Sequence, residues 1–180
     1  MAKDFDPHRL DVRRFAEEGA ELAADEGLAR FRRLAAETVG LPNEAAVHWE
    51  AKGELLNPRH VHPQVWLHLS AGATLPLVCQ RCLAPVDVPV AVDRSFRFVP
   101  DEATAAAEDD TSEEDLLALS RSFDLLELVE DELLMEMPVA PRHEVCPEPV
   151  KMSAVDPDFD TGDSERENPF AVLGGLKTGK

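Results

Sequence analysis

Three cysteines and one histidine are the residues of this chain best suited to bind a ligand or to react. Cys79 and Cys82 are separated by two residues, the spacing with which two thiolates bind one zinc ion. His143 and Cys146 offer a second pair further along the chain. Together they make a complete ligand set for a closed tetrahedral site, whose role would be structural. Zinc is therefore one interpretation of these residues.

Two other interpretations of the cysteines stay open. In the first, all three thiols are free or buried, and Cys79 and Cys82 only shape a turn. In the second, Cys79 and Cys82 exchange disulfides as a thiol oxidoreductase. Reactive pairs of that kind lie at a helix N-terminus, whereas residues 83–92 have the pattern of a turn and a strand. An odd number of cysteines without an export-signal pattern also argues against a disulfide framework.

Other catalytic arrangements are missing from the sequence. No glycine-rich phosphate loop precedes a helical pattern, and no nucleophile-elbow motif occurs. His60 and His62 lie in a proline-flanked connection without a paired carboxylate motif, so exposed loop histidines are the simpler explanation. We predict no catalytic residues and no enzymatic activity. The N-terminus has no apolar signal run and no segment is apolar enough to span a bilayer, so we expect a cytoplasmic protein.

The elements that must position these side chains follow from hydrophobic periodicity. Short amphipathic helices are expected up to Gly19 and over residues 28–38, where apolar residues recur at helical spacing. Residues 47–51, 65–69 and 86–98 alternate between apolar and polar side chains, which predicts strands. Pro85 and Pro89 disfavour a central position in the sheet for the last strand. The pattern indicates an antiparallel sheet of about three to five strands.

The clearest helix is expected at about 124–137, where Asp124 and Glu127 have the capping-box spacing and Pro138 ends the helix. The expected fold is α+β: a small antiparallel β-sheet packed with this acidic helix and the N-terminal helices, within one domain over residues 1–146. An acidic loop at about 100–115 has no large apolar residue and is expected to be disordered. Residues 147–180 are expected to form an acidic flexible tail that ends in an apolar motif at 168–177.

The charge of the chain is uneven, and this bears on its partners. Residues 1–100 carry a net charge of −2 and residues 101–180 a net charge of −16. Such a polyanion is repelled by phosphate backbones, so we expect neither DNA binding nor membrane association, and basic proteins are the favoured direct partners. Candidate partner-binding residues lie on the acidic helix and in the apolar motif: Glu127, Glu130, Asp131, Phe170, Leu173 and Leu176.

Direct contact with RNA is an alternative hypothesis. Arginines cluster in the predicted N-terminal helices, and two tryptophans could stack on bases. The residues concerned are Arg9, Arg13, Arg14, Arg30, Arg32, Arg33, Trp49 and Trp66.

An ordered set of motifs resembles one known family. The set comprises the cysteine pair in CQRCL at 79–83, the acidic run DLLELVEDE at 124–132, Pro138, and the tail NPFAVL at 168–173. Together these segments are similar to the YceD family, over most of the chain from about Trp49 onward.

The resemblance implies a role in the synthesis, processing or stability of large-subunit (23S) ribosomal RNA, so that this RNA accumulates. It implies no established reaction and no catalytic residues. We therefore expect a ribosome-biogenesis factor that binds a basic ribosomal or maturation protein and acts on the 23S RNA directly or indirectly. The direct RNA-binding protein and the thiol oxidoreductase are the alternatives, and zinc is the one cofactor indicated.

Overall fold

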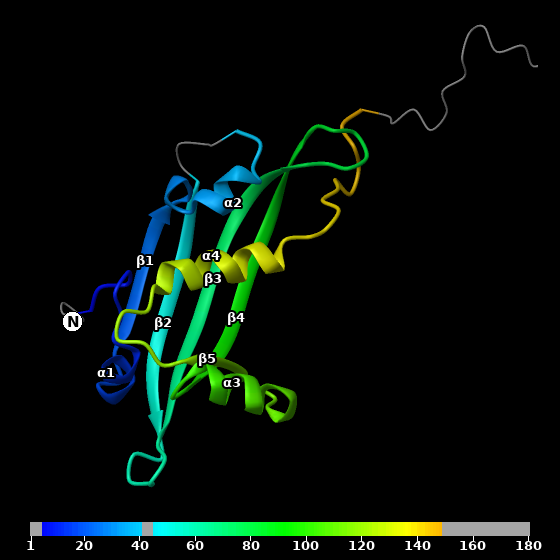
Figure 1. The fold of residues 1–180 in the computed structure, drawn as a ribbon. Helices are drawn as coiled ribbons and strands as arrows, with labels where there is room; N and C mark the ends of the chain where they lie inside the picture. The colour runs from blue at the N-terminus through cyan, green and yellow to red at the C-terminus, as the bar shows by residue number, and fades with distance from the viewer. Residues whose placement is uncertain (1–4, 41–44, 149–180) are drawn as a thin grey trace, which may run out of the picture. The chain divides into compact units, whose positions relative to one another are not determined.

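The computed structural model describes residues 5–40 and 45–148, which build one five-stranded sheet and the helices beside it (Figure 1). Successive strands lie side by side in the order β1-β2-β3-β4-β5 and are antiparallel, except that β5 runs parallel to β4. In chain order the elements are α1 (Val12–Glu17), β1 (Glu21–Gly27), η1 (Leu28–Arg30), α2 (Arg32–Ala36), β2 (Ala46–Leu56), β3 (Gln64–Val78), β4 (Pro85–Val99), α3 (Glu102–Glu108), η2 (Asp109–Thr111), β5 (Asp115–Ala118) and α4 (Leu125–Glu136).

The alternation that predicted the strands places apolar side chains on one face of the sheet. In β2, Val47, Trp49 and Ala51 are buried, while His48 and Glu50 between them are exposed. Side chains of successive residues in a strand point to opposite faces, so this pattern gives one apolar and one polar face. The predicted strands at 47–51, 65–69 and 86–98 are confirmed as β2, β3 and β4.

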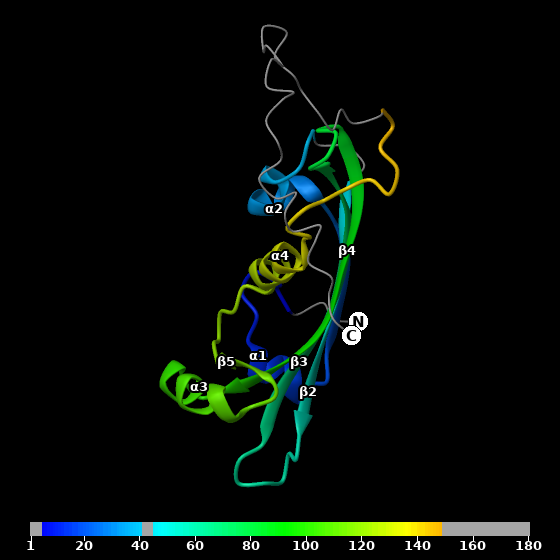
Figure 2. The same ribbon diagram turned by 90° about the vertical axis from the view of Figure 1, so that its right-hand side faces the viewer.

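The helices cover the apolar face of the sheet. Figure 2 shows α1, α2, α3 and α4 on the same side of the strands. Helix α4 runs across the middle of the sheet and buries Leu126, Val129 and Leu133 against it. Burial of each large aliphatic side chain contributes about 1.5–3 kcal/mol, so this helix and the sheet form the main core. The expected α+β architecture is confirmed.

The predicted start and end of α4 are confirmed, although among the described residues Glu127 makes no return bond of a capping box. The Asp124 carboxylate accepts hydrogen bonds from the backbone N–H groups of Leu126 and Glu127 at 3.1 Å each, which satisfies two of the free donors at the helix start. The helix ends at Glu136, two residues before Pro138, which cannot continue it.

Close packing of α1 on β2 depends on one glycine. A Cβ atom on Gly53 would lie 2.7 Å from the Phe15 ring and 2.7 Å from the Phe15 carbonyl oxygen. The backbone N–H of Gly53 donates to the Ala20 carbonyl at 2.9 Å in the same contact. The absence of a side chain therefore lets the chain around α1 lie directly on the strand.

The prolines of β4 lie where a missing N–H costs least. Strand β5 pairs only with residues 96–99 of β4, so Pro85 and Pro89 lie on the part of β4 whose outer edge has no partner strand among the described residues. This agrees with the expectation that these prolines exclude a central position.

Two N-terminal elements differ from the sequence expectation. The predicted helix at 28–38 is divided at Phe31 into η1 and α2, because Phe31 has an extended ψ of 84°. The sequence did not predict strand β1. Its inward-facing positions carry only two apolar residues, Leu22 and the small Ala24, which are half-buried. Two such residues give too weak an alternation of apolar and polar side chains to indicate a strand.

The acidic segment at 100–115 is ordered, contrary to the prediction from sequence. It was expected to be disordered, but it forms α3 and η2. The Asp101 carboxylate caps α3 by accepting from the backbone N–H of Thr104 at 2.8 Å, Ala105 is buried, and Glu108 pairs with Arg97 of β4 at 3.0 Å. A helix cap, an ion pair to the sheet and small apolar residues order this segment without a large side chain.

Of the tail predicted at residues 147–180, everything from residue 149 onward, including the apolar motif at 168–177, lies outside the described residues. Phe170, Leu173 and Leu176 therefore have no structural account here.

Candidate metal centre

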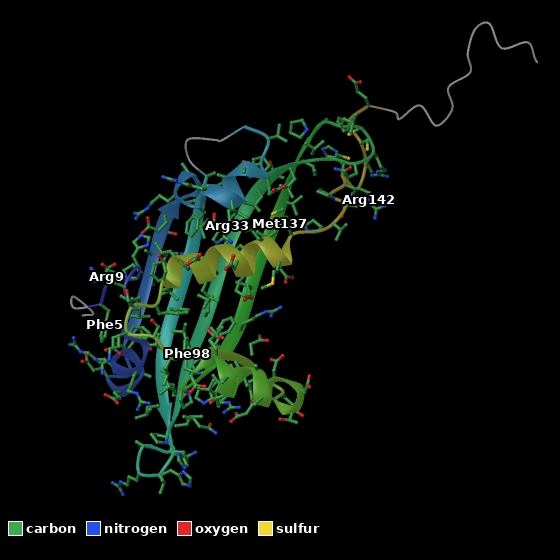
Figure 3. The ribbon with its side chains drawn as sticks, in the orientation of Figure 1. Phe5, Arg9, Arg33, Phe98, Met137 and Arg142 are labelled. Atoms are coloured by element: carbon green, nitrogen blue, oxygen red, sulfur yellow. The ribbon has the colours of Figure 1, made fainter. Side chains whose placement is uncertain are left out.

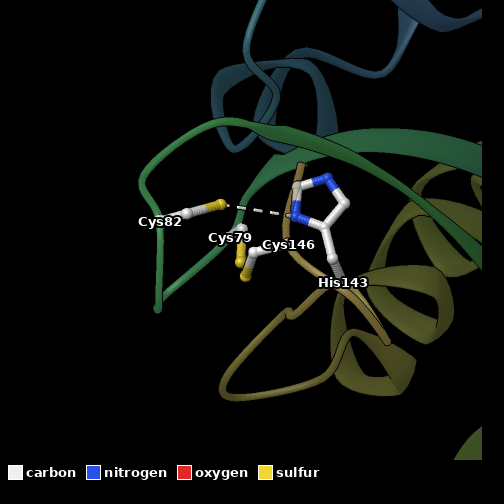
Figure 4. A group of neighbouring side chains, drawn as sticks. All are labelled: Cys79, Cys82, His143 and Cys146. Atoms are coloured by element: carbon white, nitrogen blue, oxygen red, sulfur yellow. Dashed lines mark hydrogen bonds between the residues drawn. The ribbon is translucent and has the colours of Figure 1, made fainter. Parts of the chain in front are cut away.

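The first cysteine pair lies in the turn between β3 and β4. Cys79 directly follows the last residue of β3, and its backbone N–H donates to the Ala84 carbonyl at 2.9 Å. The Leu83 N–H closes the turn on the Cys79 carbonyl at 2.9 Å, and Leu83 has a positive φ of 60°. This compact turn brings the Cys79 and Cys82 side chains to the same side (Figure 4).

The second pair comes from the segment after α4, which returns to this turn. The Gln80 N–H donates to the Pro141 carbonyl at 2.8 Å, and the Arg81 guanidinium donates to the carbonyl oxygens of His143 and Glu144. These bonds tie residues 141–144 to the turn although more than 60 residues separate them in sequence. The backbone itself therefore positions the second pair of ligands.

All four predicted metal ligands come together. One donor atom from each of Cys79, Cys82, His143 and Cys146 lies within 4.8 Å of the others. Cys82 Sγ lies 3.4 Å from His143 Nδ1 (Figure 4). Sulfur ligands of tetrahedral zinc, with bonds of about 2.3 Å, lie about 3.8 Å apart, so a small contraction of the cluster would complete such a site.

The environment of the cysteines favours a thiolate at Cys79. Burial acts to raise the pKa of its thiol, but hydrogen bonds from the backbone N–H groups of Cys82, His143 and Arg81 and from the His143 side chain together lower the pKa to about 5. Burial raises the pKa of Cys146, as do hydrogen bonds to Cys82 and Cys79. Metal binding requires deprotonated thiols, and N–H donors directed at sulfur are the usual support for such ligands.

The donor set fits a structural metal site better than the two alternatives. Three sulfur atoms and one imidazole nitrogen suit zinc, and four protein ligands leave no open position for a substrate. Residues 79–84 form a turn between two strands, so Cys79 and Cys82 lack the helix N-terminus that activates redox pairs. None of the three thiols is in a disulfide.

The predicted partner-binding carboxylates of α4 divide into two kinds. Glu127 is exposed and has no partner among the described residues. Glu130 instead accepts from the backbone N–H groups of Arg33 and Leu34 at 2.7 and 3.1 Å, and its other oxygen pairs with Arg33 Nε at 3.0 Å. Asp131 also binds the Arg33 guanidinium, and Figure 3 labels Arg33 beside α4. Glu130 therefore caps α2 from outside, and both carboxylates are already occupied.

The residues named for direct RNA contact do not form one surface. Arg14, Arg30 and Arg33 are paired with Glu18, Glu26 and Glu130 respectively. Trp49 is 2% exposed and cannot stack on a base, whereas Trp66 is half-buried on the other face of the sheet, stacked on His68 at 6.4 Å between ring centroids.

The sequence did not predict the hydrogen bonds from Gln80 and Arg81 to carbonyl oxygens of the segment after α4. Every residue has a backbone carbonyl, so the residue types give no sign of such a contact. Nor did the sequence predict the pairing of Arg94 in β4 with the buried Glu132 of α4 at 3.2 Å. The acidic pattern of α4 had indicated only a solvated face there.

No described helix has the length and apolar character that crossing a membrane would need.

A protein-family model matches most of the chain. The model of the family described as "Large ribosomal RNA subunit accumulation protein YceD" matches residues 67–177. The matched region contains all four residues of the cysteine–histidine cluster, together with β4, α3, β5 and α4. No solved structure matches this chain.

Proposed function

The chain belongs to the YceD family of large ribosomal RNA subunit accumulation proteins, and from this premise we propose that it is a non-catalytic assembly factor of the large ribosomal subunit. It acts in the cytoplasm by binding a basic ribosomal or maturation protein, and in this way it supports the synthesis, processing or stability of the 23S RNA. The observation that carries the proposal is the family match over residues 67–177.

The distribution of carboxylates supports a basic partner. The chain has a net charge of −18. Glu130 and Asp131 are bound to Arg33 and are therefore not available to a partner. The available acidic side chains are exposed ones that have no ion pair among the described residues. Besides Glu127 they include Glu102, Asp109, Asp110 and Glu113 of α3, η2 and the following loop. Complementary charge speeds encounter with the right partner and excludes wrong ones, so binding will weaken as salt rises.

We also propose that the cysteine–histidine cluster binds one zinc ion with a structural role. Cys79, Cys82, His143 and Cys146 would hold it. The ion would link the β3–β4 turn to the segment after α4, which otherwise contributes exposed apolar side chains such as Val139 and Val145. The ion would then fix the end of the sheet that lies opposite α3 (Figure 1).

The test is the ratio of large-subunit to small-subunit ribosomal RNA in cells depleted of this protein. We expect a selective fall in the large-subunit RNA, reversed when the wild-type protein is restored. An unchanged ratio on depletion would refute the assembly role.

Charge reversal separates the partner surface from the rest of the molecule. We expect failed restoration from a variant in which Glu102, Asp109, Asp110 and Glu113 are changed to Lys. The control variant changes Glu37, Glu50, Asp87 and Asp93 to Lys, which alters the charge equally at other exposed positions. Equal restoration by both variants would remove the acidic surface from the mechanism and leave the family role intact.

A further inference from the structure

A groove runs along the end of the sheet opposite the metal centre. One hollow of about 330 Å³ lies between α1 and the connection from β5 to α4, and its basic side chains are Arg13, Arg14 and Arg121. A second hollow of about 530 Å³ lies between the β2–β3 connection, the end of β4 and α3. Arg13 and Leu119 line both hollows, so the two adjoin. Figure 1 shows α1, α3 and the β2–β3 connection together at this end.

Backbone pairing fixes the arginines that converge on this groove. Leu10 and Phe123 exchange two backbone hydrogen bonds, of 2.8 and 2.9 Å, which hold the segment before α4 beside the start of α1. The Leu119 N–H donates to the Val99 carbonyl at 2.8 Å and ties the same segment to the end of β4. Residues from distant parts of the sequence are thus held together by the fold, and the hollow does not depend on a loose loop.

Arg13 and Arg121 differ in their ion pairing from Arg14, which pairs with Glu18, and from the paired arginines elsewhere. Arg30, Arg33 and Arg94 each have a carboxylate partner at ion-pair distance. Within residues 5–40 and 45–148, Arg13 and Arg121 have none, and both are exposed. An arginine without an internal partner keeps its five donors available for an anion.

The donor geometry suits phosphate groups. Guanidinium groups bind phosphate oxygens with two parallel hydrogen bonds, and Ser120 adds a hydroxyl group to the same hollow. Two carboxylates, Asp11 and Glu17, also line it, and Asp11 accepts the backbone N–H of Arg14 as the cap of α1. The surplus of positive charge is therefore small and fits a few phosphates.

The second hollow offers a different surface next to the arginines. Its lining includes the His62 ring with the apolar residues Val61, Pro63 and Leu119. Unstacked bases of single-stranded RNA bind to rings and apolar side chains of this kind, while the bases of a duplex are covered by stacking. The strong negative charge of the whole protein also disfavours a long, highly charged duplex.

We propose that this groove binds a short single-stranded segment of RNA, with its phosphates on Arg13 and Arg121 and one base beside His62 and Leu119. The site goes beyond the proposed function, in which a basic protein binds the acidic surface. It shares with the earlier RNA hypothesis only Arg13, and it adds Arg121 and His62 from other elements.

The experiment measures fluorescence anisotropy of a labelled single-stranded RNA of about 12 nucleotides, within the range that small RNA-binding folds cover. The purified full chain is titrated into it at about 50 and about 200 mM salt. The test variant carries Arg13→Glu and Arg121→Glu. The matched control carries Arg9→Glu and Arg32→Glu, two exposed arginines outside the groove that also lack an ion pair among the described residues. Both variants change the charge by the same amount.

We expect wild type to bind and its affinity to fall with salt, with a slope of about −1.4 in log–log form for two phosphates at ~0.7 each. The groove variant should lose at least ~10-fold in affinity and show a shallower slope, while the control variant changes less than ~3-fold. Thermal unfolding of each variant checks its fold. If the Glu variant unfolds, Arg13→Gln with Arg121→Gln, which introduces no new charge, replaces it.

Several results would overturn the proposal. The first is no binding by wild type up to about 100 µM protein at the lower salt. The second is an equal loss in the groove and control variants, which would mean that only overall charge matters. The third is tighter binding of a poly-glutamate peptide that depends on Arg13 and Arg121, which would assign the groove to an acidic protein segment. The fourth is equal binding of a duplex of the same length.

Discussion

The helix–sheet core and the end of the sheet that carries the cysteine–histidine cluster differ in what holds them together. In the core, Trp49, Leu67 and Leu133 are at most 2% exposed, and hydrophobic burial is sufficient. At the cluster, Cys79 is the one buried member, Leu83, Val139 and Val145 are exposed, and residues 137–148 form no helix or strand. Hydrophobic burial therefore organises the sheet, whereas hydrogen bonds to the β3–β4 turn and the proposed metal would organise this end of it.

The largest effect should come from removing metal ligands. Zinc contributes an apparent ~10–16 kcal/mol in small zinc modules, and here it would hold a segment with little apolar burial. We expect Cys79→Ser with Cys82→Ser to reduce bound zinc from about one ion per chain to none. Hydrogen exchange should become fast at residues 139–148 and stay slow in β3 and α4.

Metal content and hydrogen exchange on the same samples make this test. Gln80→Ser is the control, since Gln80 lies in the same turn but is no ligand. A wild-type protein that binds no zinc would contradict the metal site. If wild type binds zinc but the double variant loses the protection of the whole sheet, the sheet would also depend on the metal, and the two regions would not be stabilised separately.

The next effect concerns the core. Leu133 of α4 is fully buried, so Leu133→Ala should cost about 2–5 kcal/mol in the free energy of unfolding through lost burial and the cavity left behind. Zinc content should not change. Denaturant unfolding measures the loss, and Met135→Ala is the control because Met135 on the same helix is 64% exposed. Loss of zinc in the Leu133 variant would show that the metal centre depends on the core packing.

The same contrast explains which features could be predicted from sequence. Trp49 and its neighbours alternate with polar residues, and Asp124 precedes an apolar helical stripe, so local pattern alone located β2 and α4. The four candidate ligands were predicted from residue type and spacing, because thiolates and imidazole are the groups that bind zinc and can be recognised without knowing their burial.

Non-local contacts could not be predicted in this way. The cap of α2 comes from Glu130, which lies 97 residues from Arg33, and no local signal announces it. Helix α3 was missed because its order depends on a cap at Asp101 and on the pairing of Glu108 with Arg97, whereas its composition alone resembles a disordered acidic segment. Such elements depend on the sheet being in place.

A smaller effect should come from the Glu130 cap, which joins α2 to the core by polar contacts. Glu130→Ala leaves the N–H groups of Arg33 and Leu34 without their acceptor, so we expect a cost of about 1–3 kcal/mol. Denaturant unfolding gives the cost, and hydrogen exchange should show α2 opening first. Glu127→Ala, on the same helix without a partner, should stay within ~0.5 kcal/mol. Equal effects of the two variants would show that the cap does not stabilise α2.

The smallest effect concerns the one charged side chain buried in the described core, Glu132, which is 4% exposed. Burial raises its pKa above the ordinary 4.5, the Arg94 guanidinium lowers it, and Asp115, Asp131 and Glu136 raise it further. The folded protein therefore holds this proton more tightly than the unfolded chain does. The stability that this carboxyl contributes is complete below pH 4.5 and is lost as the pH rises through the raised pKa.

Glu132→Gln removes that titration, so its melting temperature should equal that of wild type at about pH 4 and exceed it at about pH 7. Arg94 keeps Asp115 as a partner at 3.3 Å, which limits the loss from the broken pair. Glu136→Gln, an exposed change on the same helix, should show no such pH-dependent gain. A Glu132→Gln variant that melts below wild type at neutral pH would mean that the pair with Arg94 outweighs the cost of burial, and the core would then depend on a polar contact as the metal centre does.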